Sequence, residues 1–487
     1  MNYRMIFYTT AKVIMTVGVL LFLPLIIAVC YSEASALYIA ITSIGAIVVG
    51  YLLMKLTTPK NNVIYSREGF IIVTFSWLIL SLIGCLPFYL SGQIPSFIDA
   101  FFETVSGFTT TGASILNNPA DMDKGLLLWR SFTHWIGGMG IIVFIVAINK
   151  KVSDRSIHVL RAEMPGYSVD KLVPKAKDTA IILYLIYIAL TVLEIILLTF
   201  GDMTFFESVI HSLGTTGTGG FGIKADSISS YSAYSQWVIA IFMFLSAINF
   251  NLFFLVIVGK IKNAIKSNEL ICYLIMVLVS IIIVSVSIYP EYKNIEEVLR
   301  LSTFQVTSTI STTGYSTANF DLWPQLAKTI LIFLMFVGGC AGSTAGGFKV
   351  TRIVILFKRI GKELRKIIHP RSVEVVKAEG KTIEESTVNS IGIYLALYIT
   401  SFISIFVLVC IFGGNFAPDA NLFETHFTAT LACLNNIGPG LNAVGPMANF
   451  ANYNPITKII LSFAMLLGRL ELYPLLITIS PTTWLKR

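Results

Sequence analysis

Long runs of apolar residues, separated by short polar segments, recur along most of the chain. A helix needs roughly 20 mostly apolar residues to cross a lipid bilayer. Runs that reach or approach this length lie at 11–31, 36–54, 69–91, 126–149, 179–200, 233–259, 270–289, 325–348, 386–413 and 455–480. The pattern therefore predicts an all-α polytopic membrane protein with about ten transmembrane helices.

After the first two runs, one pattern recurs four times. It consists of an apolar span, a short half-apolar segment, a turn rich in Thr and Gly, and a second apolar span. The turns read T-T-T-G-A-S at 109–114, G-T-G-G-F-G at 217–222, S-T-T-G-Y-S at 311–316 and N-N-I-G-P-G at 435–440. The short segments cannot cross a bilayer, so we expect them to be re-entrant.

The repeats divide the chain into five predicted parts. Two N-terminal transmembrane helices come first, and each later part holds one repeat with its pore loop. The parts are 1–67 for the N-terminal helices, 68–178 for repeat 1, 179–268 for repeat 2, 269–384 for repeat 3 with a broken inner helix, and 385–487 for repeat 4.

The four turns are candidates for a cation filter. Non-helical backbone inside a membrane is tolerated only where protein buries it or water lines it. Carbonyl oxygens from four turns around one axis could replace the water shell of a dehydrated cation, and glycine allows the backbone conformations that this requires. The residues expected to coordinate the ion by main-chain oxygens are Thr110, Thr111, Gly112, Thr218, Gly219, Gly220, Thr312, Thr313, Gly314, Asn436, Ile437 and Gly438.

Charge sets the expected orientation. Only 13% of the residues are charged and 55% are hydrophobic, against about 25% charged residues in an average soluble protein. With the N-terminus inside, the inside segments hold 27 of the 35 Lys and Arg residues and the outside segments hold 6, as the positive-inside rule requires. The net charge of +8 therefore reflects membrane topology and not nucleic-acid binding. An excess of acidic residues outside would concentrate cations at the entrance.

Five glycines crowd the apolar run at 325–348. They are Gly338, Gly339, Gly342, Gly346 and Gly347. Each glycine costs a helix about 1 kcal/mol relative to alanine, so the sequence predicts a break in this inner helix. Tight helix packing through Gly342 and Gly346, spaced as in the small-xxx-small motif, is the alternative.

Arg469 lies within the last apolar run, in L-L-G-R-L-E-L. A charge there costs at least ~2.5 kcal/mol, and Glu471 is two residues away and on another part of the helix face. Two interpretations stay open. Arg469 either faces the inner pore as a barrier to cations or is anchored to backbone carbonyls between helices.

The four turns and three further stretches resemble the Trk/Ktr/HKT superfamily of potassium transporters, specifically the bacterial TrkH/TrkG type of membrane subunit. The further stretches are R-S-F-T-H-W-I-G-G-M-G at 130–140, G-G-C-A-G-S-T-A-G-G-F-K at 338–349 and L-N-N-I-G-P-G-L at 434–441. The third turn, at 311–316, is also similar to the T-V-G-Y-G filter of potassium channels. The resemblance covers essentially the whole chain, including the two extra N-terminal spans.

The resemblance implies potassium uptake across the inner (cytoplasmic) membrane of a bacterium, through a channel-like pore inside four units on a pseudo-fourfold axis. It implies that the glycine stretch, with Ser343 and Thr344, forms a loop that obstructs and gates the pore below the filter. It also implies a homodimer with one pore per subunit and a cytosolic TrkA-type nucleotide-binding ring protein as regulator. Potassium is then the transported ligand, with no cofactor on this chain, and both termini are cytoplasmic.

Other functions are less well supported by the sequence. It has no Ser/His/Asp arrangement, no His pair with metal-ligand spacing and no phosphate-binding glycine loop with its Lys, so we expect no enzyme. A symporter that couples potassium to Na⁺ or H⁺, or a sodium-permeable transporter, is the main alternative. The basic segment 349–385 is interpreted as the docking site of the regulator, with a helix facing lipid headgroups as the alternative.

Overall fold

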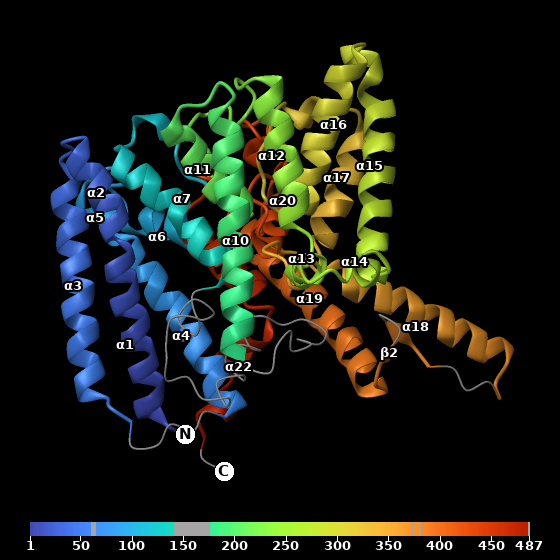
Figure 1. Cartoon of the computed structure of the whole chain (residues 1–487), viewed down its shortest axis with the longest axis horizontal. Helices are drawn as coiled ribbons and strands as arrows, with labels where there is room; N and C mark the ends of the chain where they lie inside the picture. The colour runs from blue at the N-terminus through green and yellow to red at the C-terminus, as the bar shows by residue number, and fades with distance from the viewer. Residues whose placement is uncertain (60–64, 141–175, 372–374, 379–380, 486–487) are drawn as a thin grey trace.

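Helices dominate the computed structural model, which describes residues 1–59, 65–140, 176–371, 375–378 and 381–485 (Figure 1). The helices are α1 (Tyr3–Leu20), α2 (Phe22–Cys30), α3 (Ser35–Leu56), α4 (Ser66–Gly84), α5 (Leu86–Leu90), α6 (Phe97–Phe108), α7 (Lys124–Met139), α10 (Ala176–Thr199), α11 (Phe205–Thr216), α12 (Ala233–Ser246), α13 (Phe250–Ile257), α14 (Ile261–Ile265), α15 (Asn268–Tyr292), α16 (Ile295–Ile310), α17 (Gln325–Val337), α18 (Val350–Ile368), α19 (Glu385–Phe412), α20 (Leu422–Asn435), α21 (Pro455–Arg469) and α22 (Tyr473–Ile479). Two-residue strands β1 (Lys377–Ala378) and β2 (Lys381–Thr382) pair antiparallel after α18.

Six helical segments in the described part of the chain are long and apolar enough to cross a membrane. They are Tyr3–Cys30, Ser35–Leu56, Arg67–Leu90, Asp178–Thr199, Asn268–Tyr292 and Glu385–Phe412. Large apolar side chains are exposed along them, such as Ile282 and Val286 on α15, which are 62% and 71% exposed. A surface of this kind suits lipid and not water as the surrounding solvent.

The other four predicted spans are the inner helices of the repeats, and none is described as one straight helix. α12 and α13 meet at an angle of 92°. α17 ends at Val337, where the glycine stretch begins, and α21 and α22 are separated by a short break. α7 ends at Met139, and the rest of its predicted span, 141–149, lies outside the described residues. Backbone freed by such breaks is stable in a membrane only where protein or water satisfies it.

One unit of outer helix, short helix, turn and inner helix occurs four times. The units are α4–α5, α6 and α7; α10, α11 and α12; α15, α16 and α17; and α19, α20 and α21. We call the short helices α6, α11, α16 and α20 the pore helices. In each unit the pore helix packs against both its outer and its inner helix.

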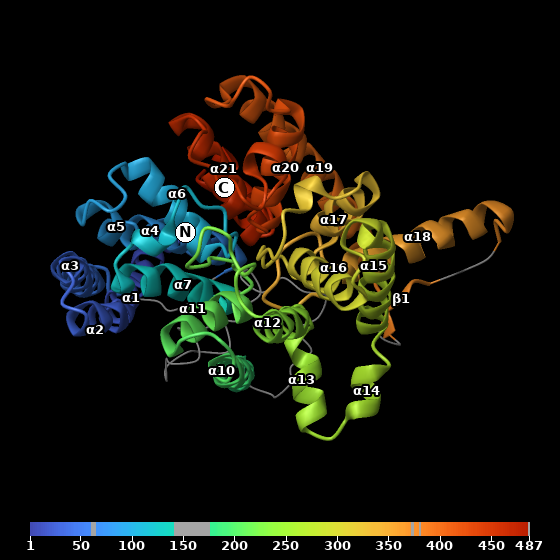
Figure 2. The same cartoon turned by 90° about the horizontal axis from the view of Figure 1, so that it is seen from above.

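The units form a closed ring. The inner helix of each unit packs against the pore helix of the next, α7 on α11, α12 on α16 and α17 on α20, and α21 of the fourth unit returns to α6 of the first. Figure 2 shows the units following one another around a common centre. α1, α2 and α3 pack against one another and against helices of the first unit, outside the ring (Figure 2).

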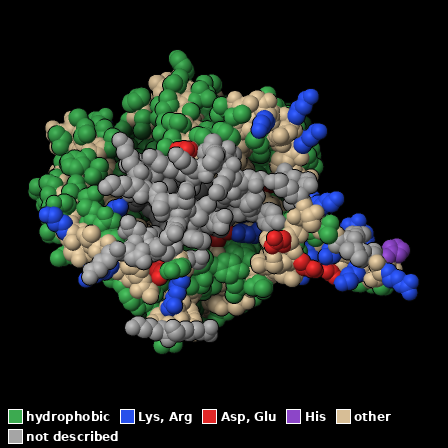
Figure 3. Space-filling view, turned by 60° about the horizontal axis from the view of Figure 1, so that its bottom comes forward, with side chains coloured by type: hydrophobic (Ala, Val, Ile, Leu, Met, Phe, Trp, Pro, Cys, Tyr) green, Lys and Arg blue, Asp and Glu red, His purple; other side chains and the backbone are tan. Residues whose placement is uncertain are grey.

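α18 projects sideways from the ring below α15 (Figure 1). It follows the glycine stretch and carries Lys and Arg side chains, which gather along it in Figure 3. The inner helix of the third unit is therefore continued, after its break, by a basic helix that leaves the body of the protein.

Candidate ion pathway

Each pore helix ends directly at the turn predicted for its repeat. The last helical residues are Phe108, Thr216, Ile310 and Asn435. The C-terminal end of a helix carries a partial negative charge of about half an elementary charge. Four such ends next to the four turns make this region favourable for a cation.

The four turns share one backbone conformation, in the register set by the aligned glycines. The φ angles are +54° at Thr110, +54° at Thr218, +57° at Thr312 and +56° at Asn436, and then +79° at Gly112, +82° at Gly220, +86° at Gly314 and +98° at Gly438. The left-handed conformation costs a non-glycine residue roughly 1–2 kcal/mol. Strain that recurs at four equivalent positions indicates a functional constraint on the backbone.

The middle amide of each turn caps its pore helix. It donates to a carbonyl five residues earlier, from Thr111 to Ser106 (2.9 Å), Gly219 to Gly214 (2.8 Å), Thr313 to Ser308 (3.0 Å) and Ile437 to Ala432 (2.9 Å). In contrast, no described backbone N–H donates to any of the twelve carbonyl oxygens that the sequence assigns to the filter. Buried carbonyl groups are nearly always paired. Nine of the twelve residues are buried, so their oxygens call for another partner.

The turns touch one another in a second closed ring. A Cβ atom on Gly112 would overlap the carbonyl oxygen of Gly219, one on Gly220 that of Thr313, one on Gly314 that of Ile437, and one on Gly438 that of Thr111. A glycine of each turn thus packs on the middle carbonyl of the next, and the fourth turn packs on the first. Side chains are excluded at these positions because backbone occupies the space.

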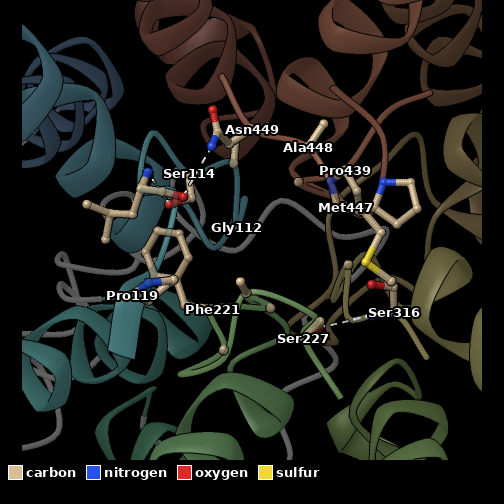
Figure 4. Close-up of a pocket in the computed structure, with 18 of the residues that line it drawn as sticks. Gly112, Ser114, Pro119, Phe221, Ser227, Ser316, Pro439, Met447, Ala448 and Asn449 are labelled. Atoms are coloured by element: carbon tan, nitrogen blue, oxygen red, sulfur yellow. Dashed lines mark hydrogen bonds between the residues drawn. The ribbon is translucent and has the colours of Figure 1, made fainter. Parts of the chain in front are cut away.

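A hollow of about 130 Å³ adjoins this ring on the side of the segments that follow the turns. The four aligned glycines line it, together with residues from all four units (Figure 4). Its walls are held by hydrogen bonds between units, such as Ser316 N to Ser227 Oγ at 3.2 Å. The hollow lies on the predicted outer side, and we call it the vestibule.

A buried ion pair joins the first two turns at the vestibule. Arg130 Nε on α7 lies 2.7 Å from Glu103 Oε1 on α6, with side-chain exposures of 3% and 0%. Glu103 also accepts from the Ile115 amide at 2.9 Å, and Arg130 donates to the Gly222 carbonyl at 3.0 Å. Loss of one partner of a buried pair typically costs 3–5 kcal/mol, so this pair fixes the first turn against the second.

The sequence did not single out this pair. In the sequence Glu103, Glu207 and Glu424 look alike, because a phenylalanine directly precedes each of them. In the structure Glu207 and Glu424 are instead the third residues of their pore helices, as is Asp99 in α6, and an N-cap side chain accepts from the amide of each. An acidic third residue after a Ser, Thr or Asn cap was the signal that would have separated Glu103 from the others.

His134 joins the same two units deeper in the protein. Its Nδ1 lies 2.7 Å from the Gly107 carbonyl oxygen and its Nε2 lies 3.2 Å from the Phe221 amide. Because Nε2 accepts from an N–H, the ring proton is on Nδ1, which donates to Gly107. His134 therefore has a structural role, in which it holds the second turn against the first pore helix.

Residues 338–349, which we call the intramembrane loop, lie against the inner ends of the turns. The Gly346 amide donates to Thr312 Oγ1 at 2.6 Å, and a Cβ on Gly346 would overlap the Asn435 carbonyl oxygen. The predicted gating residues Gly338, Gly339, Gly342, Ser343, Thr344, Gly346 and Gly347 all belong to this loop. It contains no helix, so it does not have the helix packing through Gly342 and Gly346 that was the alternative.

Arg469, at the end of α21, donates to three backbone carbonyls. Nη1 lies 2.9 Å from Thr344 O, and Nη2 bonds Gly138 O at 2.6 Å and also Gly137 O. Thr344 belongs to the third unit, and the two glycines belong to the first. Since the first and third units lie opposite each other in the ring, a side chain of the fourth unit that reaches both crosses the space under the four turns. Arg469 is thus anchored to carbonyls and lies below the turns.

Glu471 pairs with Arg352 of α18 and not with Arg469. The guanidinium of Arg352 also lies 4.1 Å from the centre of the Tyr394 ring on α19. This contact ties the start of the basic helix to the fourth unit, directly below the intramembrane loop.

Comparisons with known proteins agree along most of the chain. The family model TrkH, described as a cation transport protein, matches residues 36–485. The Trk system potassium uptake protein TrkH of Salmonella typhimurium is 33% identical over 99% of this chain and 100% of its own length. The Trk system potassium uptake protein TrkG of Escherichia coli (strain K12) is 33% identical over 95% of this chain and 94% of its own length. The crystal structure of the potassium transporter TrkH from Vibrio parahaemolyticus has a TM-score of 0.88 and 29% identity and covers both chains completely.

Proposed function

The chain belongs to the TrkH family of cation transport proteins, and from that premise we propose how it performs potassium uptake. It is a TrkH-type potassium uptake transporter. We propose that the ions pass along the axis of the ring and are coordinated by the twelve carbonyl oxygens from Thr110–Gly112, Thr218–Gly220, Thr312–Gly314 and Asn436–Gly438. The observation that carries this proposal is that these oxygens receive no described backbone N–H.

The physics of a dehydrated cation supports this site. Carbonyl oxygens that replace the hydration shell offset the cost of removing water. The four pore-helix ends add negative potential at the same place. The closed ring of glycine–carbonyl contacts keeps the spacing of the oxygens from varying freely.

Flux into liposomes that hold the purified protein tests the proposed function. We expect rapid uptake of potassium and rubidium and much slower uptake of sodium and lithium, because the larger ions match a rigid ring of carbonyls. Uptake driven by the potassium gradient alone is expected for a channel-like pore. A strict requirement for a sodium or proton gradient would support a symporter instead, and equal rates for all four ions would contradict a carbonyl filter.

We propose that the intramembrane loop closes this pathway from the inner side. Its support is the contact of Gly346 with Thr312 and of Thr344 with Arg469, which place the loop directly beneath the filter turns. In this proposal the protein lies in the bacterial inner membrane with both termini in the cytoplasm, as the distribution of Lys and Arg favours. The division at residues 67, 178, 268 and 384 belongs to the same proposal, as does a homodimer with one pore per subunit.

The proposal includes a cytosolic TrkA-type ring protein that docks on the inner surface along α18. No described segment outside the membrane is long enough to form a nucleotide-binding domain of its own. α18 connects directly to the loop and carries exposed basic side chains, so a bound partner could pull on the loop. Binding would shift the population toward the open pore.

Charge reversal on α18 tests the docking site. Arg359 contacts the Val388 carbonyl and Lys362 contacts Glu385, so both hold α18 against α19 and are left unchanged. The triple variant reverses Lys358, Arg365 and Lys366 to Glu. We expect at least tenfold weaker co-purification with the ring protein in detergent, because several like charges then meet at the contact.

The matched control reverses three basic residues of another inner segment, Lys260, Lys262 and Lys266. We expect this variant to bind the ring protein as the unchanged protein does. If the α18 variant also retains binding and nucleotide-dependent flux, the regulator docks elsewhere, and α18 is a helix on the membrane surface.

A further inference from the structure

One carboxylate joins the two ends of the intramembrane loop. We call these ends its stems, the first at Ala341 and the second at Thr351, where the loop continues into α18. Glu269 lies in the first turn of α15 and is 7% exposed. Its Oε1 accepts a hydrogen bond from the backbone amide of Ala341 at 2.6 Å and another from the hydroxyl of Thr351. Ala341 lies near the start of the loop and Thr351 in the first turn of α18. A single oxygen atom therefore closes the base of the loop.

Residues at the bend between α12 and α13 contact the same loop on the side that faces Glu269. The Phe250 amide, just after the bend between α12 and α13, donates to the Gly342 carbonyl at 3.0 Å. A Cβ on Gly342 would lie 3.0 Å from Asn249 Oδ1. The loop is thus held from this side by the second and third units and from the pore side by Arg469 and Thr312.

We propose that Glu269 is a positioning residue that keeps the intramembrane loop in the closed position by tying Ala341 to Thr351. This inference rests on the proposed function, in which the loop obstructs the pore. A buried carboxylate is stable only while donors satisfy it. Here one donor comes from each stem, and the Asn249 side chain is a further partner outside the loop. The closed loop and the bonded carboxylate therefore stabilise each other.

The same contact gives α18 a direct connection to the loop. Thr351 is the second residue of α18, so a movement of this helix away from α15 breaks the bond to Glu269 first. The bond to Ala341 can persist, because it belongs to the other stem. Opening therefore begins with the separation of the two stems at Thr351.

Basal flux of the full-length protein in liposomes, with no partner present, tests this role. For Glu269→Ala we expect potassium flux to rise at least about tenfold, because the two hydrogen bonds that tie the stems together are lost only from the closed state. Glu269→Gln keeps an acceptor oxygen in the same place, so its flux should stay within about twofold of the unchanged protein. The preference for potassium over sodium should not change in either variant, since the filter turns are untouched.

The chain supplies a matched control in Glu68. This glutamate also lies in the first turn of a membrane-spanning helix, α4, and is 5% exposed. It accepts from the amides of Tyr65 at 3.0 Å and Asn2 at 3.3 Å, away from the loop. Glu68→Ala removes an equally buried carboxylate and should leave basal flux unchanged.

The possible outcomes separate this inference from the proposed function. Deletion of residues 340–346 should raise basal flux if the loop obstructs the pore. If the deletion raises flux and Glu269→Ala does not, Glu269 does not hold the loop. If neither raises flux, the loop does not obstruct the pore and both proposals fail. An equal rise in Glu68→Ala, or a Gln variant as leaky as the Ala variant, would also overturn the assignment.

A milder pair of variants covers the case in which Glu269→Ala fails to fold, as judged by thermal unfolding. Thr351→Val removes the hydroxyl donor without changing the shape of the side chain, and Thr351→Ser keeps it. We expect a rise of about threefold in flux for valine, because one of the two hydrogen bonds is lost, and none for serine. Equal flux in the two variants would contradict the proposed role of Glu269.

Discussion

Gly314→Ser is expected to lower the preference for potassium over sodium at least about tenfold while most of the protein still folds. Gly314 has a φ of +86°, which disfavours any residue with a side chain. A Cβ there would also overlap the Ile437 carbonyl oxygen and lie 2.9 Å from Pro439 Cδ. Since Ile437 contributes one of the proposed ligands, the new side chain would displace an oxygen of the filter. Competition between potassium and sodium in liposome flux measures this effect.

Gly92 provides the control for backbone strain alone. Its φ of +75° is also left-handed, but no atom lies within 4 Å of a Cβ built there. Gly92→Ser should therefore carry a similar conformational cost of about 1–2 kcal/mol and leave selectivity unchanged. If Gly314→Ser were expressed normally and kept full selectivity, the four-turn filter would be wrong.

Arg469→Ala is expected to raise cation flux about tenfold or more. Its guanidinium lies under the four turns and bonds carbonyls of two opposite units. Two unit charges ~4 Å apart repel by about 4 kcal/mol at an effective dielectric constant of 20, so even a partly screened arginine opposes a passing cation. Alanine also removes the hydrogen bond that holds Thr344 of the loop. The measurement is potassium flux in liposomes, normalised to folded protein.

Arg469→Lys separates the charge from the hydrogen bonds. Lysine keeps the charge and should stay close to the unchanged protein if charge alone closes the pathway. Lysine cannot reproduce the planar fork with which arginine reaches three carbonyls. Flux as high as that of the alanine variant would show that anchoring of the loop is what matters. Loss of folding in both variants would assign Arg469 a purely structural role.

The sequence alone determined the parts of this protein that depend on local chemistry. Apolar runs predicted membrane spans because a bilayer accepts only segments with few charges, and six of them are helical segments long enough to cross a membrane in the structure. The four turns and their aligned glycines were also visible, because the positions where backbone packs on backbone admit no side chain. The glycine stretch marked the end of α17 because helices rarely continue through several glycines.

The tertiary structure decided what depends on residues far apart in the chain. Only the fold shows that the buried Glu103 pairs with Arg130, which lies on another helix 27 residues further along the chain. Only the fold connects Glu471 to Arg352 and Glu269 to both stems of the intramembrane loop. A buried charge must find a partner, but which partner depends on helix packing between units. That packing joins segments separated by tens to hundreds of residues, and no local pattern encodes it.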